Sequence, residues 1–261
     1  MNVNLNWEID QNIANEYVKA CDEIVSDELF LNFKKDSRYR HILEGGTKLT
    51  FDYFLDKIKT LPNKNLFFDN LEIFRKNDLY GNPDLYEDKE IGKFSLTTLK
   101  YSYNALEIIN FLGDYSPKKI VEIGGGYGGL CRAISSYMNF ENYMIFDLPE
   151  VNRLCEKYIS NFDGLSEKVV QSFYDEVESV ENIDLLISNY AFSECSFDLQ
   201  KSYYDGVISN ADKFYISYNN ITTRNMGIDY FKEYASRHFD IHSEDEVRKC
   251  HTNYILFGTK K

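Results

Sequence analysis

Residues 119–130, which read KIVEIGGGYGGL, decide the fold of this chain. Ile120, Val121 and Ile123 form a short apolar run, which is typical of a strand buried on both faces of a sheet. The glycine-rich stretch 124–129 then permits a sharp turn and lets a ligand lie directly on the main chain. Apolar residues at helical spacing come next. A strand, a glycine turn and a helix N-terminus in this order predict a site for a nucleotide-like ligand, because free backbone N–H groups face it.

The spacing of the glycines fits two classes of cofactor. Gly124, Gly126 and Gly129 match G-x-G-x-x-G, the pattern of dinucleotide-binding turns. Gly124, Gly126 and Gly128 match G-x-G-x-G, a pattern that favours S-adenosylmethionine. Glu122 favours the second class, because a carboxylate in a buried strand is costly without a partner and the ammonium of a methionine moiety would be one. An ordinary glycine-rich turn between strand and helix is the alternative without a ligand.

Composition limits the classes of protein to consider. The 261 residues are 43% hydrophobic, enough for one large domain or two small ones. Lys and Arg number 29 against 42 Asp and Glu, a net charge of −13, which argues against a surface for a nucleic acid polymer but permits a local basic pocket. Five scattered cysteines without metal-ligand spacing predict reduced thiols in a cytoplasmic protein and no metal site. The sequence shows no secretory signal and no apolar run long enough to span a membrane.

We expect the chain to divide near residue 115. Residues 1–115 are predicted to be mainly helical and to form a cap with part of an acceptor pocket; one expected helix buries Phe51, Phe54, Leu55 and Ile58. Residues 116–261 alternate strand and helix, as in a Rossmann-like catalytic domain. They end in two β-like runs, 239–243 and 253–259, and the short connection between these runs predicts an antiparallel pair.

Polar residues at the strand ends are candidates for cofactor contacts. Asp147 ends the expected second strand, where it can accept hydrogen bonds from ribose hydroxyls or start the next helix. Ser172 and Phe173 come after the third, where an adenine would lie. Asn189 and Tyr190 follow the fourth strand, 183–188, at the mouth of the crevice.

The stretches VEIGGGYGG, FDLPEV and LLISNYAFSE resemble those of class I S-adenosylmethionine-dependent methyltransferases. More narrowly, they resemble bacterial sugar O-methyltransferases of surface polysaccharide synthesis, over about residues 95–220. The resemblance implies an α/β sheet of seven strands in the order 3-2-1-4-5-7-6, with the last strand antiparallel. It also implies S-adenosyl-L-methionine as cofactor. The predicted cofactor site comprises Glu122, Gly124, Gly125, Gly126, Gly128, Asp147, Leu148, Ser172, Phe173, Asn189 and Tyr101.

Transfer of a methyl group to a sugar hydroxyl needs a base, because a hydroxyl is a weak nucleophile. Glu194, just past the fourth strand, has the best chain position for this role, although it could instead cap the next helix. His251 is a second candidate, as is His41. Tyr190 is predicted to orient the acceptor, or else to belong to the core of a chain with 21 tyrosines.

Residues 34–41 contain a basic knot made of Lys34, Lys35, Arg38, Arg40 and His41. It is either a solvated face balanced by neighbouring carboxylates or a clamp for a phosphate on the acceptor. On the second hypothesis, the acceptor-binding residues are Arg38, Arg40, His41 and Asn219. Lys100 occupies a position where the resemblance leads us to expect arginine, and a lysine cannot reproduce a planar bidentate contact.

The sequence therefore predicts an O-methyltransferase that acts on a sugar or sugar-nucleotide in capsule or lipopolysaccharide synthesis. Three alternatives stay open: a methyltransferase with an amine or phosphoryl-oxygen acceptor, a nicotinamide-dependent oxidoreductase, and a cofactor-binding scaffold without chemistry. Its expected partner is a small-molecule acceptor, and a homodimer is also open.

Overall fold

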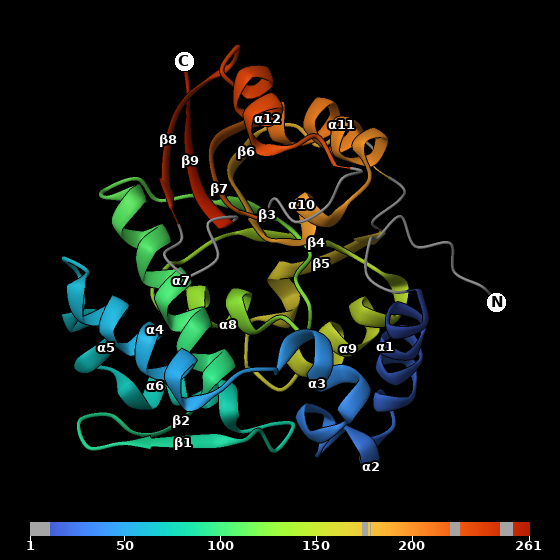
Figure 1. Cartoon of the computed structure of the whole chain (residues 1–261), viewed down its shortest axis with the longest axis vertical. Helices are drawn as coiled ribbons and strands as arrows, with labels where there is room; N and C mark the ends of the chain where they lie inside the picture. The colour runs from blue at the N-terminus through green and yellow to red at the C-terminus, as the bar shows by residue number, and fades with distance from the viewer. Residues whose placement is uncertain (1–10, 174–176, 178, 220–224, 246–252) are drawn as a thin grey trace.

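A seven-stranded mixed sheet runs through the C-terminal part of the chain in the computed structural model (Figure 1). The structure describes residues 11–173, 177, 179–219, 225–245 and 253–261. In sequence order, the strands of this sheet are β3 (Lys119–Ile123), β4 (Asn142–Asp147), β5 (Val169–Phe173), β6 (Ile183–Asn189), β7 (Ala211–Asn219), β8 (Phe239–Asp245) and β9 (Asn253–Lys260).

The strands lie side by side in the order β5-β4-β3-β6-β7-β9-β8. The first five are parallel, and β9 is antiparallel to both β7 and β8. With β3 counted as the first strand, this order is 3-2-1-4-5-7-6, so the predicted sheet and its closing antiparallel pair are confirmed. The parallel strands end on one edge, which brings the residues after β3, β4 and β6 together there.

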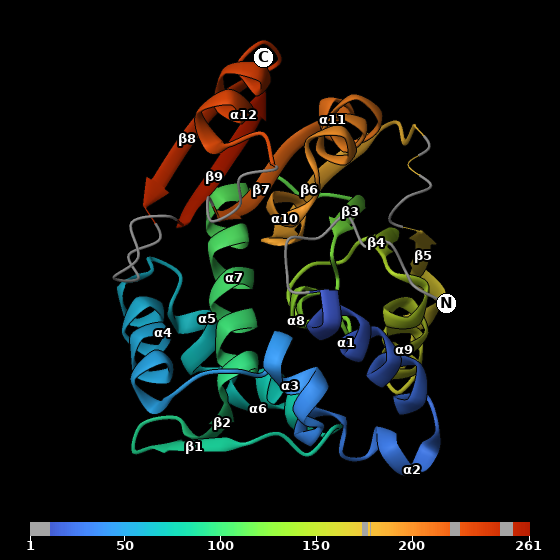
Figure 2. The same cartoon turned by 45° about the vertical axis from the view of Figure 1, so that its right-hand side comes forward.

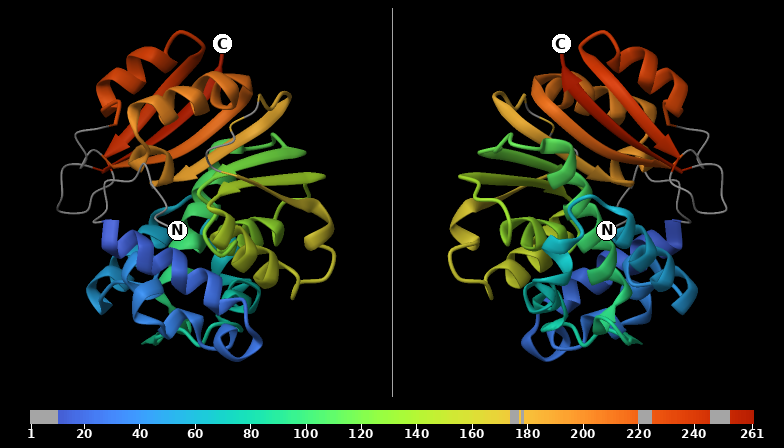
Figure 3. Two further views of the ribbon diagram at one scale, coloured as in Figure 1. Left: turned by 90° about the vertical axis from the view of Figure 1, so that its right-hand side faces the viewer. Right: turned by 90° about the vertical axis from the view of Figure 1, so that its left-hand side faces the viewer.

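Helices cover both faces of the sheet (Figure 3), and residues of the strands pack against one layer or the other. Val121 and Ile123 pack in a core with α10 (Ala191–Glu194), α11 (Phe197–Gly206) and α12 (Ile228–Ala235). Ile120 and Tyr143 belong to the other core, which includes α7 (Leu96–Leu112), α8 (Gly129–Ser135) and α9 (Pro149–Ile159). Both faces are thus covered, as the apolar run of β3 predicts.

The N-terminal part covers the second of these layers. Its helices are α1 (Gln11–Ile24), α2 (Asp27–Phe30), α3 (Ser37–Leu43), α4 (Lys48–Thr60), α5 (Asn65–Phe68) and α6 (Leu71–Arg75), joined by 3-10 turns such as Phe33–Lys35. The four apolar residues predicted for one helical face are the buried residues of α4. A two-stranded antiparallel sheet, β1 (Leu85–Asp88) and β2 (Gly92–Ser95), was not predicted.

Helix α1 lies beside α9, and α4 to α6 lie beside α7 (Figure 2). Tyr17 of α1 and Phe54 of α4 share one continuous core with Leu130 and Ile187 of the sheet region. The division at residue 115 stays a prediction; in the structure that residue follows α7, and the core continues across it. Within the described ranges, no helix is long and apolar enough to cross a membrane.

Candidate cofactor and acceptor site

A cavity of about 390 Å³ lies at the C-terminal ends of β3, β4 and β6, under α1, α3 and α7. It brings together many of the residues predicted from the sequence: Glu122, Gly124, Gly126, Asp147, Asn189, Tyr101, Tyr190, Glu194 and His41. The predicted residues Gly125, Gly128, Leu148, Ser172, Phe173, Arg38, Arg40 and Asn219 lie outside its lining. His251 falls outside the described residues.

The glycine turn follows β3 because its backbone adopts conformations that other residues avoid. Gly124 has a φ of 80° and Gly126 a φ of 53°. A Cβ on Gly124 would lie 2.0 Å from the Cβ of Ala191, so the turn after β3 passes directly against the turn after β6. Only glycine permits both the positive φ and this close approach. Gly128, also at positive φ, is the N-cap of α8.

Glu122 lines the cavity and is buried, with 2% of its surface exposed. The Tyr143 hydroxyl donates a hydrogen bond to Oε2 at 2.8 Å. Burial raises the pKa of the carboxyl to about 8, although the Tyr143 hydrogen bond works in the opposite direction. The carboxyl is therefore mainly protonated at pH 7 until a cation reaches it. An ammonium group at this end of the cavity would supply the missing positive charge.

Asp147, at the end of β4, holds the glycine turn from the other side. Its Oδ2 accepts a hydrogen bond from the Gly126 N–H at 2.9 Å, and Oδ1 accepts one from the Leu148 N–H at 2.8 Å. Desolvation raises its pKa to about 6 in spite of these hydrogen bonds. Each carboxylate oxygen has a further lone pair. The predicted contact with ribose hydroxyls stays a prediction, and the residue has a structural role besides.

The residues predicted to surround an adenine do not line the cavity. Leu148 is buried at the N-cap of α9. Ser172 and Phe173 are the last residues of β5 rather than residues that follow it. The carbonyl of Ser172 accepts a hydrogen bond from Asn152 Nδ2 at 2.7 Å, and the Phe173 ring is 45% exposed. Their contact with an adenine stays a prediction.

Glu194 lies in α10 and lines the cavity, and its carboxyl is anchored by a neighbouring strand. Asn219 at the end of β7 donates from Nδ2 to Glu194 Oε1 at 2.9 Å, so Asn219 supports the candidate base from outside the cavity. Desolvation raises the pKa of Glu194, while the Asn219 hydrogen bond and Lys100 lower it. A carboxylate whose pKa is raised by burial is a stronger proton acceptor than an exposed one.

Tyr190 links β6 to α10 with a φ of 69°, which is uncommon for a residue with a side chain. Lys100 of α7 places its ammonium 4.7 Å from the centroid of the Tyr190 ring. Both residues line the cavity next to Glu194. This part of the cavity thus combines a carboxyl, an ammonium and an aromatic face.

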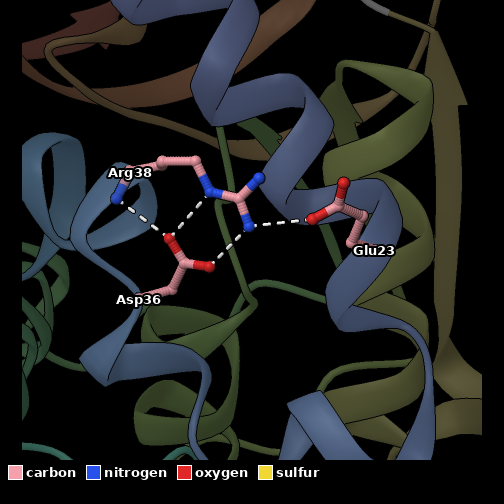
Figure 4. A network of polar contacts seen from close by, with 3 residues as sticks. All are labelled: Glu23, Asp36 and Arg38. Atoms are coloured by element: carbon pink, nitrogen blue, oxygen red, sulfur yellow. Dashed lines mark hydrogen bonds and ion pairs between the residues drawn. The ribbon is translucent and has the colours of Figure 1, made fainter.

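The basic knot does not form one surface. The Lys34 side chain is buried, whereas Lys35 and Arg40 both form ion pairs with Asp84. Arg38 is held by two carboxylates, Asp36 at 2.7 Å and Glu23 of α1 at 2.9 Å (Figure 4). These contacts account for Arg38 and Arg40 without a ligand.

Several residues of the N-terminal half line the cavity, although no local sequence pattern predicted them there. Tyr17 of α1, Leu43 of α3 and Thr97 of α7 all line it. His41 lines it too and is exposed. Among the described residues, no group of three or more His, Cys, Asp or Glu side chains could hold a metal ion. The described cysteines, Cys21, Cys131, Cys155 and Cys195, are unpaired and buried.

A scan of protein-family models finds no match to this sequence, and a search of curated proteins finds none either. Solved structures do match. The glycopeptide N-methyltransferase MtfA, complexed with S-adenosyl-L-methionine, is similar with a TM-score of 0.50 and 12% identity, over 61% of this chain and 94% of that one. The methyltransferase domain of bacterial CtHen1 gives a TM-score of 0.49 at 11% identity over 60% and 97%, and the PH0226 protein of Pyrococcus horikoshii OT3 gives 0.49 at 12% over 63% and 92%.

The strand order and the likeness to MtfA define the fold. The chain has the Rossmann-like fold of class I methyltransferases, with its glycine turn after the first strand of the sheet and an acidic residue at the end of the second.

Proposed function

We propose that this protein is an S-adenosylmethionine-dependent O-methyltransferase that acts on a sugar or sugar-nucleotide hydroxyl. The observation that carries the proposal is the placement of Glu194 in the same cavity as Glu122 and the glycine turn. The cavity thus offers both a buried carboxyl for an ammonium and a candidate base. A role in the synthesis of surface polysaccharide is supported by the resemblance of the sequence motifs.

The cavity residues fit the proposed cofactor. Gly126 of the glycine turn lies on the cavity wall close to the cap: a Cβ on it would lie 3.3 Å from Leu43 and 3.9 Å from the Tyr101 hydroxyl, and both of these residues also line the cavity. Glu122 would hold the ammonium of the methionine moiety, and Asp147 the ribose. When bound, the cofactor supplies a methyl group activated by its sulfonium sulfur.

The chain's own contribution would be to position the acceptor and to accept one proton. Glu194 would take the proton of the acceptor hydroxyl while the acceptor oxygen attacks the methyl carbon, and the products are a methyl ether and S-adenosylhomocysteine. Tyr190 and Lys100 would orient the acceptor above the methyl group. Most of the rate enhancement would come from alignment of the reacting atoms.

A screen with radiolabelled S-adenosylmethionine tests the proposal directly. The purified protein is incubated with a panel of nucleotide sugars and monosaccharides, and products are separated and identified by mass spectrometry. A methylated sugar oxygen supports the proposal. Failure to bind S-adenosylhomocysteine in calorimetry would refute the cofactor, and transfer to a different acceptor class would refute the substrate.

A further inference from the structure

In the side-chain amide of Asn189, the oxygen accepts hydrogen bonds, whereas the nitrogen has no hydrogen-bond partner among the described residues. Its Oδ1 accepts two hydrogen bonds, from Asn104 Nδ2 at 2.9 Å and from Ser217 Oγ at 3.2 Å. Its Nδ2 is buried and, in the described part of the chain, has no hydrogen-bond partner. Because two donors reach Oδ1, the orientation of the amide is fixed, and Nδ2 is the atom that stays without a partner. A buried donor without a partner is destabilising, so a ligand acceptor that reaches it would be stabilised.

This unpaired donor belongs to the wall of the cavity. Asn189 ends β6 and lines the cavity together with Glu194, which follows five residues later in α10. Asn219 holds Oε1 of Glu194 by a hydrogen bond at 2.9 Å, and no other side chain of the described residues is hydrogen-bonded to this carboxyl. The wall therefore presents one N–H donor and one carboxylate acceptor.

We propose that Asn189 and Glu194 together select an oxygen, rather than a nitrogen, as the methyl acceptor. Asn189 Nδ2 donates to one lone pair of the acceptor oxygen, and Glu194 accepts the hydroxyl proton. This inference rests on the proposed function and assigns the two residues that would make its acceptor a hydroxyl group.

The count of lone pairs explains the selection. A hydroxyl oxygen has two lone pairs and one hydrogen. One lone pair accepts from Asn189, the other attacks the methyl carbon, and the hydrogen goes to Glu194. As the acceptor oxygen takes the methyl group, its O–H bond breaks and the proton goes to Glu194, while the electron pair of the S–CH₃ bond leaves with S-adenosylhomocysteine.

The other acceptor classes fit this pair of groups poorly. A neutral amine has a single lone pair, which it needs for the attack, so an N–H donor beside it competes with the reaction. A phosphoryl oxygen has no proton to give, and the carboxylate of Glu194 would repel its negative charge. Glu122 and Asp147 add further carboxyl groups to the same cavity.

Asn189 could instead bind the carboxylate of the cofactor, which is the role predicted from the sequence. Two ligands separate these roles without knowledge of the acceptor. S-adenosylhomocysteine carries the methionine carboxylate and nothing at the methyl position. Sinefungin carries the same carboxylate and places an ammonium group where the methyl would be, so it probes the acceptor end.

Calorimetry with both ligands on Asn189→Ala and Asn189→Asp provides the test. We expect Asn189→Ala to leave the S-adenosylhomocysteine Kd within about threefold of wild type. Asn189→Asp replaces the donor by an acceptor, so it should raise the affinity for sinefungin relative to S-adenosylhomocysteine by about tenfold. Asn110→Asp, at an exposed position of α7 outside the cavity, adds the same charge and should leave the ratio unchanged. Thermal unfolding of each variant checks that it is folded.

Three outcomes would overturn the inference. A loss of S-adenosylhomocysteine affinity of about tenfold or more in Asn189→Ala would assign Asn189 to the cofactor carboxylate. An unchanged ligand ratio in Asn189→Asp would remove Asn189 from the acceptor end. Finally, matched acceptor pairs, each a sugar and its aminodeoxy counterpart, are assayed with labelled cofactor; preferred transfer to nitrogen would overturn oxygen selection while leaving methyl transfer intact. A wild-type protein that binds neither ligand would refute the proposed function itself.

Discussion

Glu122→Gln tests how the cofactor end of the cavity recognises its ligand. Burial holds the pKa of Glu122 at about 8 against an ordinary value of 4.5, so ionising this carboxyl without a partner costs about 5 kcal/mol. At pH 7, roughly nine molecules in ten therefore carry the proton. A ligand ammonium that pairs with the carboxylate has to displace that proton as it binds.

We therefore expect the affinity for the proposed ligand to rise with pH. Below pH 8, the ionised fraction of Glu122 falls about tenfold for each pH unit. The affinity for S-adenosylhomocysteine should therefore rise by about tenfold or more between pH 6.5 and pH 8, with nearly one proton released per ligand at pH 7. Glutamine has a similar size but cannot ionise. Glu122→Gln should bind more weakly at pH 8 and show little dependence on pH across this window.

Calorimetry in two buffers of different ionisation enthalpy measures both the affinity and the protons released. Glu107→Gln is a matched control, because burial also raises the pKa of Glu107, to about 7, while the residue lies outside the cavity and accepts a hydrogen bond from the Tyr215 hydroxyl. Its profile should follow the wild type. Wild-type binding that is constant from pH 6.5 to 8, or a Glu122→Gln variant that keeps the wild-type slope, would refute the reasoning.

The other predictions concern the base, the turn and the basic knot. Glu194→Gln should lower kcat by about 10²-fold and leave the S-adenosylhomocysteine Kd nearly unchanged; near-normal kcat would remove Glu194 from the chemistry. Gly124→Ala should lower the free energy of unfolding by about 2–3 kcal/mol and abolish ligand binding. Gly164→Ala, at a φ of +70° but in open space, should cost less and keep binding, and equal costs in chemical denaturation would contradict the close approach. If Arg38 and Arg40 bind an acceptor phosphate, the double Ala variant should raise the acceptor KM about tenfold, whereas an unchanged KM would leave both residues with their ion pairs only.

Features that depend on neighbours in the sequence were predictable. The run 119–130 contains a strand, its turn and the start of a helix, and each follows from local apolar spacing and from glycine conformations. The antiparallel pair β8 and β9 followed from the short connection between them. The buried face of α4 followed from helical periodicity alone, because the helix packs one stripe of apolar side chains against the core.

Features that depend on distant partners were not predictable. The β1 and β2 hairpin carries the mixed polar sequence LYED and GKFS, which lacks the apolar alternation of a strand signal. For Arg38 and Arg40 the sequence left a solvated face and a phosphate clamp both open, because it shows the cations together while their partners Glu23 and Asp84 lie well away along the chain. The orientation of the Asn189 amide is likewise set from α7, by a residue 85 positions earlier.

Lys34 shows what this long-range pairing means for the site. Its buried ammonium donates to the carbonyl of Asn77 at 2.9 Å and to the Tyr127 hydroxyl at 3.2 Å. The Asn77 side chain in turn donates to the Gly129 carbonyl at 2.8 Å and accepts from Arg132 at 2.9 Å. Since Tyr127 and Gly129 belong to the glycine-rich stretch, residues of the N-terminal half hold that stretch in place. Removing the ammonium of Lys34 or the guanidinium of Arg132, both buried, would leave several polar groups unpaired. The cap therefore supports the glycine turn as well as covering the cavity.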